Sequence, residues 1–109
     1  MLEWGAFIIR FASKIADLRG ERMETKDLGT TGEGFVKWHF EFPHVHRRIC
    51  VHVRVLEGDA RVFLIPTRTL ASAIPDSHWH IGDVKTPGEL NALIPAVLAR
   101  FPHPPCKAA

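Results

Sequence analysis

Residues 35–56 read FVKWHFEFPHVHRRICVHVRVL and carry the strongest strand pattern in the chain. Apolar and polar side chains alternate through residues 35–42, and a second alternation runs through residues 48–56. A period of two places successive side chains on opposite faces of a sheet. Residues 43–46 interrupt the pattern with a proline, so we expect two antiparallel strands, each with one face on the core.

Further strands are expected on both sides of this hairpin. A turn at residues 57–59 and an apolar run at 61–65 predict a third strand, which completes an antiparallel meander. Residues 78–81 are predicted to form an edge strand. Upstream, the short apolar runs at 5–11 and 15–18 and the segment 22–26 are each interpreted as strands, and residues 29–34 as a glycine-rich loop.

Two helices are predicted in the second half of the chain. Residues 67–74 form a short candidate that ends at Pro75. The last helix has a clear beginning, because Thr86 is suited to the N-cap, Pro87 to the first turn and Glu89 to a capping box. An apolar stripe at helical spacing follows, and Pro95 inside it is expected to kink the helix. The fold class is therefore α+β, with a mixed, mostly antiparallel sheet that contains a β-meander and a C-terminal amphipathic helix.

The bulk composition is that of an ordinary globular domain. The chain has 109 residues, of which 46% are apolar, and we expect one domain at residues 1–101 and a flexible tail at 102–109. Without an apolar run of about 20 residues or a secretory signal, a cytoplasmic protein with no membrane partner is expected. The net charge of +2 permits a polyanionic partner without requiring one. Of the two cysteines, Cys50 falls in a core strand and is expected to be a packed thiol.

A possible catalytic group lies before the meander. If residues 23–26 are extended, Glu24 and Lys26 share one face, and Asp17 at the end of a neighbouring strand could stand beside Glu24. Two carboxylates would suit a hard divalent cation, which can lower the pKa of its bound water. The ammonium of Lys26 could stabilise charge that develops on a phosphate.

This order of elements resembles the restriction-endonuclease-like PD-(D/E)xK superfamily. The resemblance rests on SKIADL at residues 13–18, on Glu24-x-Lys26, and on Trp38 followed by ICVHV at 49–53 and VFLIPT at 62–67. It implies that Asp17 and Glu24 ligate Mg²⁺ (or Mn²⁺) and that Lys26 orients or activates the attacking water. It also implies a nuclease that acts on phosphodiesters of nucleic acid, with DNA as partner, and a domain of this size is expected to form a homodimer.

A second hypothesis is a non-catalytic accessory module that binds protein or nucleic acid. Arg48, His52 and Arg54 share one face of the predicted meander, where they could contact phosphates without any metal. A third hypothesis is a metal centre built from the two His-x-His pairs, which are His44 with His46 and His78 with His80. Solvated turn and edge positions account for these four histidines more simply.

Overall fold

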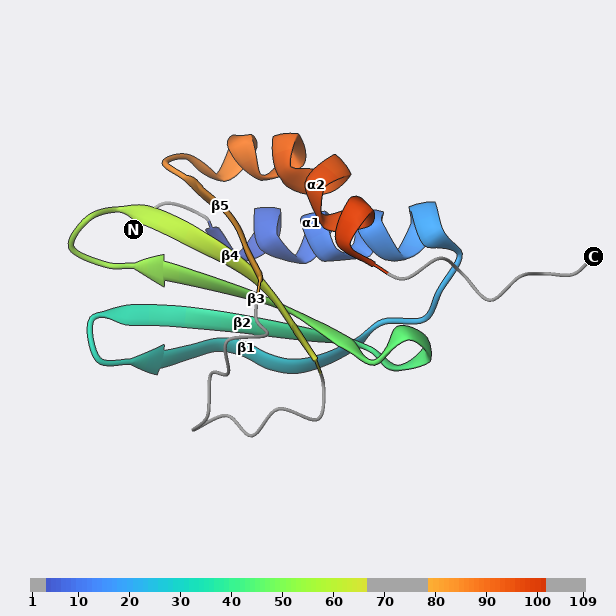
Figure 1. Ribbon diagram of the computed structural model, residues 1–109. Helices are drawn as coiled ribbons and strands as arrows, with labels where there is room; N and C mark the ends of the chain where they lie inside the picture. The colour runs from blue at the N-terminus through green and yellow to red at the C-terminus, as the bar shows by residue number, and fades with distance from the viewer. Residues whose placement is uncertain (1–3, 67–78, 102–109) are drawn as a thin grey trace, which may run out of the picture.

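The computed structural model describes residues 4–66 and 79–101, which form an α+β fold, as the sequence predicted. Five strands make up one sheet in the order β1-β2-β3-β4-β5, with every described pairing antiparallel (Figure 1). In chain order the elements are α1 (Trp4–Arg19), β1 (Glu24–Gly32), β2 (Phe35–Phe42), the 3-10 helix η1 (Pro43–Val45), β3 (Arg47–Arg54), β4 (Asp59–Pro66), β5 (Trp79–Val84), the 3-10 helix η2 (Pro87–Leu93) and α2 (Ile94–Arg100).

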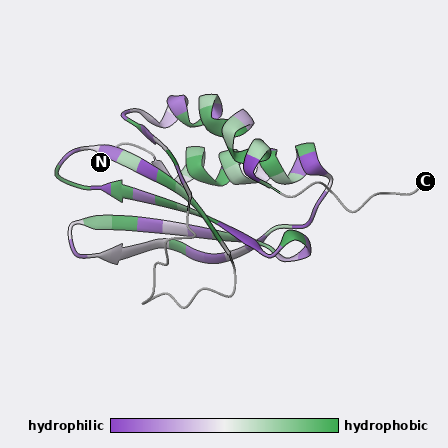
Figure 2. Ribbon diagram, viewed as in Figure 1, coloured by the Kyte–Doolittle hydropathy of each residue, from purple (hydrophilic) through white to green (hydrophobic). Residues whose placement is uncertain are grey.

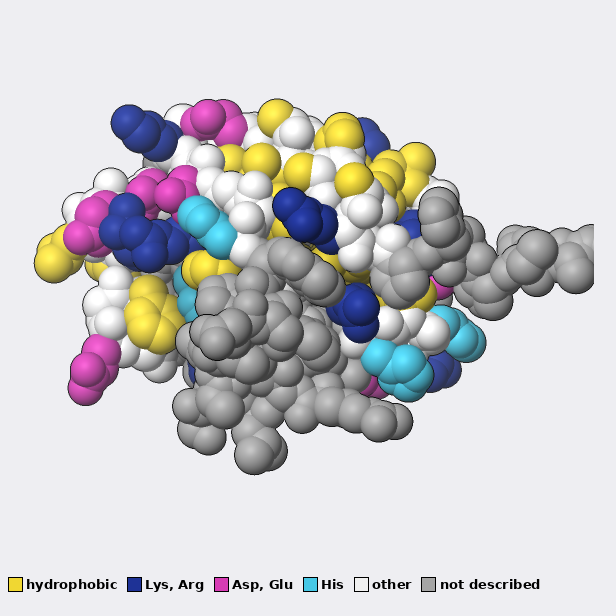
Figure 3. Space-filling model, in the orientation of Figure 1, with side chains coloured by type: hydrophobic (Ala, Val, Ile, Leu, Met, Phe, Trp, Pro, Cys, Tyr) yellow, Lys and Arg dark blue, Asp and Glu magenta, His cyan; other side chains and the backbone are white. Residues whose placement is uncertain are grey.

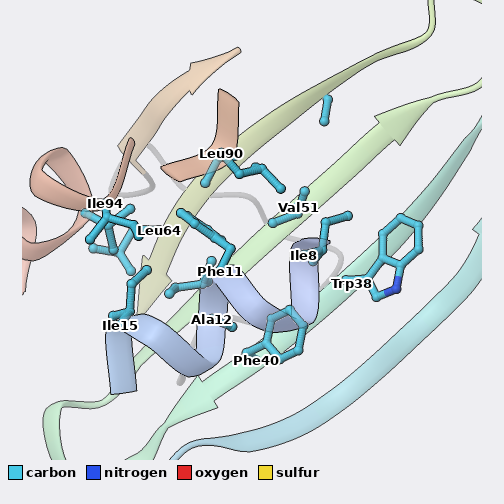
Figure 4. Close-up of a cluster of buried hydrophobic side chains, with 14 of the residues drawn as sticks. Ile8, Phe11, Ala12, Ile15, Trp38, Phe40, Val51, Leu64, Leu90 and Ile94 are labelled. Carbon is cyan, nitrogen blue, oxygen red and sulfur yellow. The ribbon is translucent and has the colours of Figure 1, made fainter. Parts of the chain in front are cut away.

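The helices cover one face of the sheet, and the core lies between the two layers (Figure 1). Alternate residues of β2, β3 and β4 point into this core and meet the apolar side of α1 (Figure 4). Figure 2 shows the resulting alternation of apolar and polar residues along the strands. The largest fully enclosed side chains of the core are Trp4, Phe11, Phe40 and Phe42.

The predicted strands at residues 5–11 and 15–18 are wrong, because both segments belong to α1. The buried side chains of this helix recur every three or four positions: Trp4, Ile8, Phe11, Ala12, Ile15 and Ala16. This is the spacing of one helix face. The polar pair Ser13 and Lys14 divides the apolar run in the sequence, but it simply falls outside the buried stripe.

The glycine-rich segment at residues 29–34 is mostly strand rather than loop. β1 continues to Gly32, and its pairing with β2 is shifted between Leu28 and Thr30, where Gly29 is the extra residue. Gly29 has a φ of 68°, a left-handed conformation that glycine adopts without steric cost. A glycine bulge thus lets the strand continue through a sequence that is typical of a loop.

The C-terminal prediction is largely confirmed. Thr86 and Glu89 form the reciprocal capping box, and the apolar stripe packs on the core through Leu90, Ile94 and Val97. Pro95 lies in the first turn of α2, where its missing N–H costs nothing. The helix changes from 3-10 to α next to this proline. β5 confirms the predicted edge strand, whereas the helix predicted at 67–74 and the tail at 102–109 lie outside the described residues.

Candidate functional site

The sheet surface opposite α1 and α2, here called the outer face, gathers most of the chemically active side chains. On β2 and β3 these residues alternate with the core residues, so they point away from the helices. The strand registers align one residue from each strand in a row across the sheet: Asp27, His39, Cys50, Phe63 and His80. A neighbouring row contains Lys37, His52, Arg61 and Asp83.

Two histidines meet on this face. The Nε2 atoms of His39 and His52 are 3.2 Å apart, the ring centroids are 5.4 Å apart and the ring planes differ by only 11°. The distance between the two centroids is longer than the distance between the two Nε2 atoms by about one ring width. The rings therefore lie end to end, with their Nε2 atoms facing each other. A hydrogen bond between them requires one Nε2 to donate a proton and the other to accept it, since a neutral imidazole has one donor and one acceptor nitrogen.

The environment favours neutral rings in this pair. Burial lowers the pKa of His39 to about 4, and the charges of His52, Lys37 and Arg48 act in the same direction. The carboxylate of Asp27, whose Oδ2 lies 3.8 Å from His39 Nδ1, opposes this shift. Burial likewise lowers the pKa of His52, with Lys37 contributing. Near neutral pH, both rings are therefore uncharged and linked by a neutral N–H···N hydrogen bond.

Aromatic and imidazole rings continue this pair across four strands. His52 stacks on Phe35, with centroids 5.2 Å apart, and lies 5.5 Å from Phe63. The Phe63 ring is in turn 5.2 Å from His80 on β5. We call these four residues the ring row: Phe35, His52, Phe63 and His80. Phe35, His52 and Phe63 are half-buried and His80 is exposed, so the row lies at the surface of the sheet.

Charged side chains surround the ring row, and most of them are paired. Arg54 holds Asp59 through two hydrogen bonds of 2.8 and 2.6 Å. Arg48 lies 3.6 Å from Glu41, which also lies 3.5 Å from Lys26. Figure 3 shows basic and acidic side chains intermixed on the visible surface, with histidines beside them.

Lys37 and Arg61, which are aligned with His52 in the strand register, have few close contacts with acidic side chains. Lys37 makes no ion pair with any residue in the described part of the chain, and Arg61 lies 3.9 Å from Asp83 and is exposed. Because these charges are not neutralised by short contacts, they are the cations of the outer face that are most available to a ligand.

The structure places Asp17 in a different layer from Glu24 and Lys26, the other two residues of the predicted catalytic group. Asp17 is an exposed residue of α1 and not the end of a strand, so that part of the prediction is wrong. Glu24 and Lys26 do meet, at 3.4 Å, and the contact of Lys26 with Glu41 places them on the outer face. The helix layer carrying Asp17 covers the opposite face.

In the structure Glu24 takes part in ion pairs, whereas Asp17 lies on α1. The Glu24 carboxylate is held by Arg22 at 2.9 Å and by Lys26. Within residues 4–66 and 79–101, no group of three or more His, Cys, Asp or Glu side chains is arranged to hold a metal. Mg²⁺ or Mn²⁺ binding stays a prediction of the sequence resemblance.

The described histidines of the third hypothesis, His44, His46 and His80, lie on different elements. His44 and His46 are exposed at η1, where His46 adopts the left-handed conformation that closes the turn. His80 Nε2 donates a 2.7 Å hydrogen bond to Asp83 Oδ1 on β5, and His78 lies outside the described residues. The described histidines of these pairs thus occupy turn and edge positions.

Cys50 lies beneath the outer face between His39 and Phe63 in the register. Its side chain is buried, and this burial raises the pKa of the thiol to about 12, despite the opposing charges of Arg48 and Lys37. A thiol with this pKa supplies almost no thiolate at neutral pH, which confirms the predicted packed thiol and argues against a nucleophile.

No family model, curated protein or solved structure matches this chain. The described helices include none with the length and apolar character required to cross a bilayer. The properties of the outer face must therefore be judged from its own chemistry.

Sequence reasoning selected His52 but missed its partner His39, together with Lys37 and Phe63. A usable signal was present, because the break at residues 43–46 fixes the centre of the β2–β3 hairpin. That centre sets Lys37 opposite His52 and His39 opposite Cys50. Pairing the two alternations through their turn would have brought both histidines onto adjacent positions of the same face.

Proposed function

We propose that this chain is a non-catalytic module that binds single-stranded nucleic acid on the outer face of its sheet. The observation that carries the proposal is the ring row, whose rings follow one another at centroid distances of 5.2–5.5 Å across β2, β3, β4 and β5. Within residues 4–66 and 79–101, the helices pack on the other face of the sheet, so the ring row and the described helices lie on opposite faces.

The rings supply the stacking part of such an interaction. Domains that bind single strands use flat side chains on an open sheet, on which unpaired bases stack. Each stacked base contributes about 1–3 kcal/mol, with little dependence on sequence. Phe63 lies at the centre of the row, between His52 and His80, and is expected to contribute most.

The nearby cations supply the phosphate contacts. Lys37 and Arg61 lie on either side of His52 in the register, so both could reach the backbone of a strand that stacks on the row. Arg48 and Arg54 point to the same face but already bind Glu41 and Asp59. We therefore expect Lys37 and Arg61 to contribute more to affinity than these two arginines, and the affinity to fall with salt.

Fluorescence anisotropy with a labelled oligothymidine of about 12 nucleotides tests this function. Phe63→Ala and Lys37→Ala should each weaken binding by about fivefold or more, since a stacked ring or a phosphate contact is lost. The matched control is Lys14→Ala, which removes an exposed lysine from α1 on the other side of the molecule. Equal affinities in all three variants, or no binding by the wild type, would refute the proposal.

The same assay separates this function from the metal-dependent nuclease. Binding through rings and cations should be the same in EDTA and in Mg²⁺, and the oligonucleotide should remain intact. Mg²⁺-dependent cleavage that disappears in Glu24→Ala or Lys26→Ala would overturn the binding-module proposal in favour of the nuclease.

A further inference from the structure

We propose that His39 and His52 share a single proton, and that the uptake of one further proton by this pair strengthens nucleic-acid binding in mildly acidic solution. The regulatory part of this inference rests on the proposed function. The structural basis is the end-to-end contact of the two rings, with Nε2 facing Nε2 at 3.2 Å.

The contact fixes the arrangement of protons. Asp27 lies on the Nδ1 side of His39, which favours a proton on that nitrogen and leaves His39 Nε2 as the acceptor. His52 Nε2 is then the donor. When a proton is added at His52 Nδ1, the N–H···N hydrogen bond is retained and the pair carries one positive charge.

A second added proton would destroy this arrangement. It would place a hydrogen on each Nε2 atom, and these atoms are too close for two N–H groups that point at each other. It would also place two positively charged rings side by side. The pair therefore behaves as one titrating unit that accepts a single proton while the fold is intact.

The charges around the pair come from four strands of the sheet. They are Asp27 on β1, Lys37 on β2, Arg48 on β3 and Arg61 on β4. The Cys50 thiol between them is neutral, and Asp83 and His80 of β5 are hydrogen-bonded to each other. Burial opposes protonation, as do the charges of Lys37 and Arg48, whereas Asp27 favours it, so the pKa of the pair falls below the ordinary imidazole value of about 6.5.

The new charge would appear within the binding surface. His52 stacks on Phe35 and lies beside Phe63, so an imidazolium there adjoins both the stacked bases and their phosphates. One additional cation at this position is expected to raise the affinity for a polyanion by about three- to tenfold.

Two measurements test the inference. The first is a nitrogen NMR experiment at about pH 7, which detects scalar coupling across an N–H···N hydrogen bond between the two imidazoles. The second is the affinity for oligothymidine, a ligand whose bases do not titrate in this range, between about pH 7.5 and 5. The wild type should show the coupling and bind more tightly at the acidic end.

Three variants make the second measurement specific. The double variant His39→Gln/His52→Gln keeps hydrogen-bonding groups at the Nε2 positions but cannot accept a proton, so its affinity should not rise in acid. His80→Gln removes the other imidazole of the ring row and should retain the rise. His44→Gln, in the exposed turn at η1, should also retain it.

The outcomes are separable. Absence of coupling, or two independent titrations of ordinary pKa, would overturn the shared proton. The regulatory role would be overturned if the coupling is present but the affinity of the wild type does not change with pH. It would also be overturned if His80→Gln, and not the double variant, loses the rise in affinity in acid. Coupling without nucleic-acid binding at any pH would refute the proposed function and its regulation but leave the shared proton established.

Discussion

Arg19 and Glu21 form an ion pair that is almost completely enclosed, although the two residues are only two positions apart. Two nitrogens of the guanidinium meet the carboxylate, at 2.6 and 3.3 Å, and the two side chains are 7% and 8% exposed. The guanidinium also lies 4.7 Å from the centre of the Phe101 ring. This pair therefore fixes the end of α1 to the segment that leads into β1 and to the end of α2.

Removal of one partner from this pair should be costly. In Glu21→Ala the guanidinium loses its two hydrogen bonds to the carboxylate, so we expect a loss of about 1.5–3 kcal/mol in the free energy of unfolding. The matched control is Glu24→Ala, whose partner Arg22 has the same sequence spacing but is 70% exposed. That variant should lose less than about 1 kcal/mol. Urea denaturation of both variants measures the difference, and similar losses would contradict the role assigned to enclosure.

The two faces of the sheet should respond differently to the loss of an aromatic ring. Phe40 is fully buried against α1, so Phe40→Ala should cost about 3–5 kcal/mol of stability through lost burial and the resulting cavity. Phe63 is half-buried on the outer face, and Phe63→Ala should cost clearly less while it impairs oligonucleotide binding. Urea denaturation and anisotropy of the two variants give the comparison. A Phe63→Ala variant as unstable as Phe40→Ala would assign Phe63 to the structure alone.

The parts of the fold that the sequence predicts well are those in which local pattern and burial agree. The β2–β3–β4 meander follows from its alternation, and the last helix from the cap at Thr86 and Glu89. The prediction of strands in place of α1 is wrong because Ser13 and Lys14 divide its apolar residues into two short runs, and a short apolar run has no distinctive period. Recognition of the helix requires the spacing from Trp4 through Ile15 to be taken as one pattern.

The candidate site was harder to predict than the fold because it depends on pairing between strands. Asp17, Glu24 and Lys26 are close in sequence, yet α1 carries Asp17 to the layer on the other side of the sheet. His39 and His52 are 13 positions apart, and only the hairpin register brings their rings together. Proximity along the chain was therefore a poor guide to proximity in space.

The cap of η2 should contribute measurably to stability. The capping box pairs the Thr86 side chain with the backbone N–H of Glu89. Glu89 Oε1 accepts from the Thr86 N–H at 2.9 Å and from the Thr86 hydroxyl at 3.0 Å. Thr86→Ala removes one half of this exchange and should cost about 1 kcal/mol in thermal or urea unfolding. Thr86→Ser keeps the hydroxyl and is the conservative control. If the alanine and serine variants unfold alike, the cap has no energetic role.

Cys50 should be unreactive while the protein is folded. Its thiol is buried and its pKa is raised to about 12, so at pH 8 only about one molecule in ten thousand carries the thiolate that reacts. A Cys106→Ser variant leaves Cys50 as the only thiol of the chain. We expect negligible labelling by a disulfide reagent in buffer and complete labelling in urea. Rapid labelling of the native variant would show that this part of the outer face is open to solvent.

The His pair should make the fold less stable as the solution becomes acidic. Burial lowers the pKa of His39 to about 4, whereas an unfolded histidine titrates near 6.5. Between these values the unfolded chain binds more protons than the folded one, so the free energy of unfolding decreases as the pH falls from about 6.5 to 4. A pKa unit corresponds to about 1.4 kcal/mol, and with the partial solvent exposure of the pair we expect a loss of about 1–2 kcal/mol.

Urea denaturation at several pH values gives this dependence, and His39→Gln/His52→Gln isolates it from the carboxylates that also titrate in acid. The double variant should lose less stability than the wild type over this range. An identical pH dependence in the two proteins would mean that the rings titrate in the folded state as they do in the unfolded chain, contrary to their burial beneath the outer face.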